Sequence, residues 1–170
     1  MKKIKEYKSV MNDKVGIRIN GNESYKNIEK NELDEIIKEI KKINFNRYPD
    51  DESLNLRKAY AEVVGIGEEN VIAGNGSDEM ISLIINYQIT KKKVVLTINP
   101  DFSMYDFYTS LNEGVVKKYN TENDGSFSVD RFIEYGRRVN PNLIIFSNPN
   151  NPTGHVISND DIIFILEAFK

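Results

Sequence analysis

Three short polar segments of the chain carry residue types that could bind a ligand, and the first is AGNGSDE at residues 73–79. Gly76, Ser77 and Asp78 come where a helix is predicted to begin. Glycine lets the backbone approach a ligand, and the free N–H groups and positive dipole end of a helix favour an anion such as phosphate. A phosphate site and a capped start of a purely structural helix are both open from these residues alone. The chain has no Gly-Lys-Ser/Thr, which excludes a nucleoside-triphosphate P-loop, and no Gly-x-Gly-x-x-Gly, which counts against a dinucleotide site.

The second segment is NPDFSMY at residues 99–105, which follows an apolar run. An aromatic residue such as Phe102, just past the end of a strand, could lie flat against a planar cofactor ring. The alternative is a core aromatic packed beneath the helix that follows.

The third segment is SNPNNPTG at residues 147–154, again after an apolar run. Its prolines fix the backbone, and its asparagine amides can donate to a ligand oxygen from a rigid position. An ordinary connecting loop rarely needs so many constrained and polar residues, so the segment predicts a binding loop.

The elements that must position these segments alternate between strand and helix. Strands are predicted at residues 71–73, 94–98, 115–119 and 143–146, and helices at 31–43 (with Asn31 as its cap), 53–64, 78–87, 103–111, 129–139 and 158–170, the last opened by a capping box at Ser158. This alternation predicts an α/β fold with a mostly parallel sheet and right-handed crossovers. Such sheets bind ligands at the carboxyl ends of their strands, which is where the three segments lie.

Composition removes several classes of function. The chain has 170 residues, a net charge of −3, no cysteine and one histidine. It therefore has no basic footprint for nucleic acid, no disulfide framework or cysteine nucleophile, and no histidine-rich metal centre of its own. The basic N-terminus is not followed by an apolar stretch, and no run is long enough to span a membrane. We expect a cytoplasmic protein with no metal site.

The third segment also carries a family resemblance. NPNNPTG at residues 148–154 resembles the signature of the fold-type I, class I/II aminotransferases, which use pyridoxal 5'-phosphate. GNGSDE at 74–79, PDFSMY at 100–105, NRYPD at 46–50 and INGNE at 19–23 are similar to the histidinol-phosphate aminotransferase branch. The resemblance implies an N-terminal arm at residues 1–30. It implies that residues 31–170 form part of the large pyridoxal-phosphate-binding domain, a parallel or mixed sheet with flanking helices.

The resemblance also implies roles for the residues that match. Gly76, Ser77 and Asp78 would hold the cofactor phosphate through backbone and side-chain donors, and Phe102 would stack on the pyridine ring, where the family usually has tyrosine. Asn151 would donate to the phenolic oxygen of the cofactor. Tyr48 would reach the cofactor phosphate of the neighbouring subunit in a homodimer.

On the substrate side, Asn20, Asn22 and Glu23 lie in the segment that would cover the substrate. The family commonly continues with Asn-Pro after this glutamate, whereas this chain has Ser24-Tyr25. The implied substrates are an amino donor such as histidinol phosphate and the keto acid 2-oxoglutarate.

The chain lacks the family's lysine, which lies in a Ser-x-Ser-Lys context, and its Asp-Glu-Ala-Tyr segment. A lysine amine is needed to hold the cofactor covalently and to move the substrate's proton. We therefore assign no catalytic residue, and we expect the chain to be the inactive N-terminal part of a longer enzyme, with weak or absent binding of pyridoxal 5'-phosphate by this part alone. The alternatives are an enzyme like threonine-phosphate decarboxylase, or a non-catalytic domain that binds a phosphorylated ligand or a partner.

Overall fold

The structure, a computed structural model, describes residue 21 and residues 23–170. These residues form two compact units, one ending at Ala73 and the other running from Gly74 to Lys170. No helix in the described part of the chain is long and apolar enough to cross a membrane.

The first unit contains α1 (Lys30–Ile40), α2 (Leu54–Val64) and the short 3₁₀ helix η1 (Glu68–Asn70). The predicted cap of α1 is wrong: the helix begins after Glu29, so Asn31 lies inside its first turn. Helix α2 ends at Gly65 as predicted, and that residue adopts a left-handed conformation with φ 74°, which glycine does without a Cβ penalty.

The strand predicted at residues 71–73 is wrong. Val71 has an extended backbone, but no strand is assigned to these residues, and Ile72 is 73% exposed. The Val71 carbonyl accepts from Nε of Arg57 at 2.8 Å, while another guanidinium nitrogen donates to the Glu68 carbonyl at 2.8 Å. The segment is therefore extended because Arg57 ties it to α2, and not because it pairs in a sheet.

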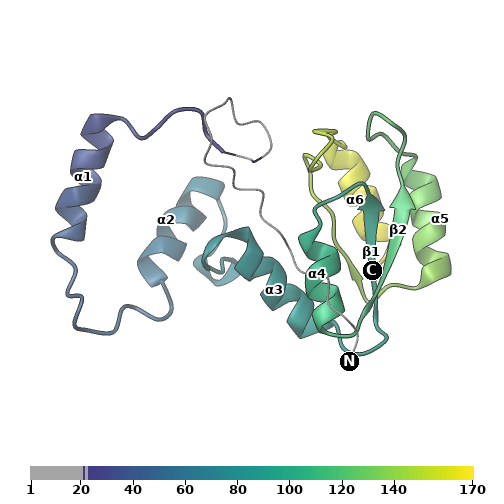
Figure 1. Cartoon of the computed structure of the whole chain (residues 1–170), viewed down its shortest axis with the longest axis horizontal. Helices are drawn as coiled ribbons and strands as arrows, with labels where there is room; N and C mark the ends of the chain where they lie inside the picture. The colour runs from purple at the N-terminus through teal and green to yellow at the C-terminus, as the bar shows by residue number, and fades with distance from the viewer. Residues whose placement is uncertain (1–20, 22) are drawn as a thin grey trace, which may run out of the picture. The chain divides into compact units, whose positions relative to one another are not determined.

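The second unit is built on a three-stranded parallel sheet with the order β2-β1-β3, which confirms the α/β class (Figure 1). Its strands are β1 (Val94–Asn99), β2 (Val115–Asn120) and β3 (Leu143–Ile144). The first two match the prediction. Strand β3 is shorter than predicted, although the Ile145 N–H still donates to the Leu96 carbonyl at 3.0 Å. The apolar segment that contains β3 therefore stays beside β1 for at least one residue after the regular strand ends.

Four helices cover the two faces of this sheet: α3 (Gly76–Gln88), α4 (Met104–Leu111), α5 (Val129–Val139) and α6 (Asn159–Ala168) (Figure 1). Because side chains alternate along a strand, Val95 faces α3 and α4, whereas Leu96 and Ile98 face α5 and α6. Strand β1 is thus covered on both sides, as its continuous apolar sequence predicts. Helix α6 begins with the predicted cap, since Ser158 Oγ accepts the Asp161 N–H at 3.1 Å.

One buried polar atom in this core has no partner among the described residues, the hydroxyl of Thr109 on α4. Thr109 is fully buried, and a buried hydroxyl without a hydrogen bond costs about 1–3 kcal/mol. We expect Thr109→Val, which has nearly the same shape, to raise the free energy of unfolding by about 1 kcal/mol in urea denaturation followed by circular dichroism.

The matched control is Thr97→Val on β1, because Thr97 is equally buried but its hydroxyl donates to Asp101 at 3.1 Å. This variant should give no such gain. A lower unfolding midpoint for Thr109→Val than for the wild type would contradict the interpretation.

Candidate functional site

The predicted binding turns after β1 and β3 lie at the same edge of the sheet, because the two strands are parallel neighbours. The turn after β1 continues through Pro100 and Asp101 into α4, and the turn after β3 runs from Ser147 to Gly154. Direct hydrogen bonds join these two turns, which are separated by more than forty residues in sequence. The two turns at this edge of the sheet are therefore held together by hydrogen bonds.

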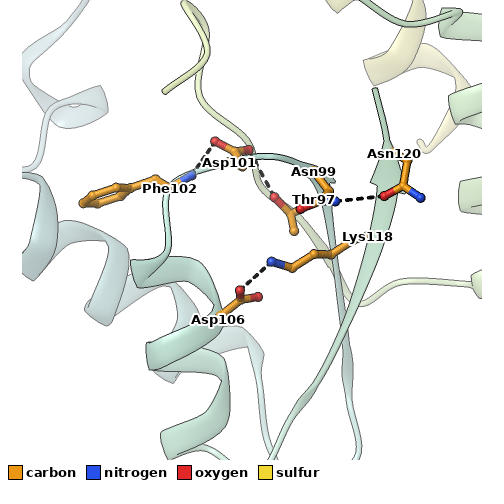
Figure 2. A network of polar contacts seen from close by, with 7 residues as sticks. All are labelled: Thr97, Asn99, Asp101, Phe102, Asp106, Lys118 and Asn120. Carbon is orange, nitrogen blue, oxygen red and sulfur yellow. Dashed lines mark hydrogen bonds and ion pairs between the residues drawn. The ribbon is translucent and has the colours of Figure 1, made fainter. Parts of the chain in front are cut away.

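The carboxylate of Asp101 is the centre of these contacts. Its Oδ1 accepts from Ser147 Oγ at 2.6 Å, from the Phe102 N–H at 2.8 Å and from Asn150 Nδ2 at 3.3 Å. Its Oδ2 accepts from the Thr97 hydroxyl at 3.1 Å. In Figure 2 the carboxylate lies between Thr97 and the backbone of Phe102, whose ring points away from the strand.

Burial raises the pKa of Asp101, against the opposing effect of its hydrogen bonds to Ser147, Phe102 and Thr97. The neighbouring Tyr105 also has a raised pKa, because it is buried and because the charge of Asp101 disfavours its phenolate. All partners of the Asp101 carboxylate are donors, which suits its ionised form even though ionisation is made costly by burial.

Two of the three asparagines in the NPNNPTG loop are used by the loop itself. Asn150 is 6% exposed; its Oδ1 accepts from Thr153, and its Nδ2 donates to the Pro100 carbonyl at 3.2 Å as well as to Asp101. The Asn148 side chain exchanges two hydrogen bonds with the backbone of Ile157. Both amides hold the shape of the loop: the two protons of Asn150 Nδ2 are both used, and Asn148 Nδ2 uses one of its two.

Asn151 differs from both. Its backbone N–H donates to Ser147 Oγ at 2.8 Å, which anchors the main chain. Its side-chain amide is exposed and has no hydrogen-bond partner within residues 23–170. The loop therefore presents one free amide from a fixed backbone, at the residue for which a cofactor contact is predicted.

The turn after β2 braces the loop. Gly125 is buried with φ +85°, and a Cβ at this position would lie 2.3 Å from the Thr153 hydroxyl. Glycine is required there because any side chain would displace the loop. Strand β2 is itself tied to the β1 side by an Asn99–Asn120 hydrogen bond at 2.9 Å and by the Lys118–Asp106 ion pair (Figure 2).

The predicted phosphate-binding residues open α3. Gly76 has φ +77° and open space where a Cβ would be, and the side chain of the preceding Asn75 makes no capping hydrogen bond. The Gly76 N–H donates to the Gly74 carbonyl at 3.0 Å, whereas the N–H groups of Ser77 and Asp78 have no described backbone partner and are available to an acceptor beside the exposed Ser77 hydroxyl. Asp78 can contribute only its backbone N–H, because an ionised carboxylate has no proton to donate.

Phe102 packs at the border of the core formed by α3 and α4. Its ring meets Tyr105 edge-on, with centroids 5.9 Å apart and an interplanar angle of 88°. It also packs against the cluster that contains Ile81, one turn beyond Ser77 on α3. One part of the ring is thus fixed by the core, and its partial exposure leaves the other part accessible.

The remaining predicted site residues are not brought to this edge by anything the structure describes. Tyr48, which is fully exposed, and Glu23, which is also exposed, belong to the first unit. Asn20 and Asn22 lie outside the described residues. The roles of all four stay predictions.

Sequence reasoning missed the residues that connect the turns, Asp101 and Ser147. Their signal was present: each is the first or second polar residue after a buried strand, and the ends of neighbouring parallel strands meet. The aromatic and asparagine side chains are recognised from the sequence as ligand contacts, whereas the residues that hold them in place are recognised only once the two strand ends are paired.

A parallel sheet with helices on both faces and constrained polar turns at its carboxyl edge is the arrangement in which α/β proteins bind their ligands. The family model for aminotransferase class I and II matches residues 14–170, so the chain belongs to this family. It is 40% identical over 168 residues to the histidinol-phosphate aminotransferase of Clostridium novyi, covering 98% of this chain and 47% of that protein. It is 37% identical to that of Clostridium kluyveri over 152 residues, covering 89% and 43%.

The fold is shared with the solved structure of the histidinol-phosphate aminotransferase from Sinorhizobium meliloti in complex with pyridoxal 5'-phosphate. The TM-score is 0.74 at 20% identity, over 81% of this chain and 37% of that one. The chain thus spans less than half the length of the relatives it matches.

The two kinds of asparagine can be separated by mutation. We expect Asn150→Ala to lower the free energy of unfolding by about 1–3 kcal/mol, because it leaves buried donors and acceptors on both turns without partners. Asn151→Ala should leave stability unchanged within about 0.5 kcal/mol, because its side chain contacts nothing in the described structure. Urea denaturation measures the free energy of unfolding of both variants. Equal losses in the two variants would contradict the distinction between a structural Asn150 and a free Asn151.

Proposed function

We propose that residues 1–170 are the N-terminal part of a pyridoxal-phosphate-dependent aminotransferase that acts on a phosphate-bearing amine such as histidinol phosphate, with 2-oxoglutarate as amino acceptor. The observation that carries this proposal is the free amide of Asn151 on a loop whose other asparagines are engaged. The family match and the histidinol-phosphate aminotransferase relatives support the substrate class.

The donors present fit pyridoxal 5'-phosphate. The N–H groups of Ser77 and Asp78 and the Ser77 hydroxyl would bind the phosphate, and Gly76, whose own N–H donates to the Gly74 carbonyl, leaves space for it to approach. The accessible side of the Phe102 ring would lie against the pyridine ring, and Asn151 would donate to the phenolic oxygen. When bound, this cofactor supplies an electron sink for bonds at the substrate's α-carbon.

On the substrate side, Asn20, Asn22 and Glu23 would cover the bound amine, and Tyr48 would reach the cofactor phosphate of a second subunit. The proposed enzyme is therefore a homodimer that acts in the cytoplasm, with small molecules as its other partners.

Binding of pyridoxamine 5'-phosphate to the 170-residue chain, measured by isothermal titration calorimetry, tests the site without requiring a lysine. We expect weak binding that is lost when pyridoxamine without phosphate is used. Asn151→Ala and Ser77→Ala should each weaken it by about 2- to 10-fold, the value of one hydrogen bond.

The matched control is Asn123→Ala in the exposed turn after β2, which should bind like the wild type. No binding by the wild type, or the same affinity for the Asn151 and Asn123 variants, would contradict the proposed site.

We also expect the 170-residue chain to show no transamination of histidinol phosphate with 2-oxoglutarate, because it has no lysine in a Ser-x-Ser-Lys context. A longer polypeptide that continues from this chain through such a segment should be active. Product formation by the purified 170-residue chain would refute this expectation. If the longer polypeptide releases carbon dioxide from threonine phosphate and does not transaminate histidinol phosphate, the decarboxylase alternative replaces the proposed reaction.

A further inference from the structure

The Asp101 carboxylate is joined at the same time to both turns that are proposed to hold the cofactor ring. On one side its Oδ1 accepts the N–H of Phe102. On the other it accepts the hydroxyl proton of Ser147, whose oxygen accepts the N–H of Asn151. The stacking residue and the amide donor are therefore connected through one carboxylate oxygen and one hydroxyl.

We propose that Asp101 is a positioning residue, which aligns the Phe102 ring and the Asn151 amide with each other through Ser147 so that both can contact the same planar ligand. This inference rests on the proposed function for the identity of the ligand. The alignment of Phe102 and Asn151 is independent of the proposed function and can be measured in the chain without a ligand.

Asp101 has this positioning role because it fixes which way the Ser147 hydroxyl proton points. Ser147 has a single hydroxyl proton, and while that proton is donated to Asp101 the oxygen lone pairs face the Asn151 N–H. Without an acceptor at residue 101 the Ser147 hydroxyl can turn toward its other neighbour, the Tyr105 hydroxyl, and the Asn151 main chain loses a fixed partner. A hydrogen bond to a carboxylate is also shorter and stronger than one to a neutral group, in keeping with the 2.6 Å distance.

A contribution to the stability of the fold does not explain why residue 101 is an aspartate. Among the described ion pairs none involves Asp101, so its charge is met only by hydrogen-bond donors. The titratable group that faces it is Tyr105 of α4; β1 contributes Thr97, and the loop contributes Ser147 and Asn150, which do not titrate.

Burial raises the folded-state pKa of Asp101 above its unfolded value. The free energy of unfolding is therefore highest at pH below the unfolded pKa, and this contribution is lost as the pH rises through the folded one. At neutral pH the ionised group costs stability, so Asp101→Asn should be at least as stable as the wild type. A neutral amide oxygen at this position still accepts from Phe102 and Ser147, so alignment should survive in this variant.

The test uses the backbone amide signals of the 170-residue chain in 1H–15N NMR spectra. In the wild type, the amides of Phe102 and Asn151 should titrate together with one midpoint above 3.8, the ordinary aspartate value. Asp101→Asn should abolish this shared titration and keep the Asn151 amide protected from hydrogen exchange. Asp101→Ala should increase its exchange rate about tenfold, with the amides of β1 unchanged.

Asp50→Ala is the matched control, because Asp50 accepts the N–H groups of Glu52 and Leu54 in an exposed segment of the first unit. It should leave the Asn151 amide as it is in the wild type. Independent titration of the Phe102 and Asn151 amides, or wild-type protection of Asn151 in Asp101→Ala, would overturn the proposal. Should Asp101→Ala not fold, the wild-type titration alone decides.

Pyridoxamine 5'-phosphate added to the same samples separates this inference from the proposed function. If the wild type binds it, Asp101→Ala should bind about tenfold more weakly and Asp101→Asn nearly as well as the wild type. If the wild type does not bind it although Phe102 and Asn151 titrate together, the proposed function fails and the positioning role stands.

Discussion

The hydrogen bond between Ser147 and Asp101 is the interaction on which the proposed ligand-binding edge of the sheet depends. It joins the end of β1 to the end of β3, and the backbone of Asn151 and that of Phe102 are each one hydrogen bond away from it. Parallel pairing brings the two strand ends to the same edge, but pairing alone leaves the turns free to adopt many conformations. The half-buried Asp101 carboxylate, which bonds to both turns, selects one of these conformations.

The sheet can support such an edge because β1 is covered on both faces. Apolar residues of α3 and α4 pack on one face and those of α5 and α6 on the other, so the polar groups at the strand ends project from a rigid core. Burial disfavours the ionised form of Asp101, and the same burial strengthens the hydrogen bonds that its carboxylate accepts. Stability is thus given up at the position where the binding turns are aligned, which is typical of functional sites.

Much of this fold could be predicted from the sequence. The four helices of the second unit and the two longer strands have the spacing that their burial requires, and the caps at Ser158 and Gly65 follow from local chemistry. The strand predicted at residues 71–73 failed because three apolar residues are compatible with any extended segment, and here Arg57 supplies the partner that a neighbouring strand would have supplied. The site was harder. Asn148, Asn150 and Asn151 are the same residue type in one loop, and only tertiary contacts decide which amide stays free.

The central claim is that the edge built around Asp101 is half of a pyridoxal-phosphate site. A crystal structure of the 170-residue chain with pyridoxamine 5'-phosphate tests it most directly. The account predicts the phosphate at the first turn of α3, the pyridine ring against Phe102, and the Asn151 amide within hydrogen-bond distance of the phenolic oxygen. A ligand bound elsewhere, or one at this edge that leaves the Asn151 amide without a contact, would contradict it.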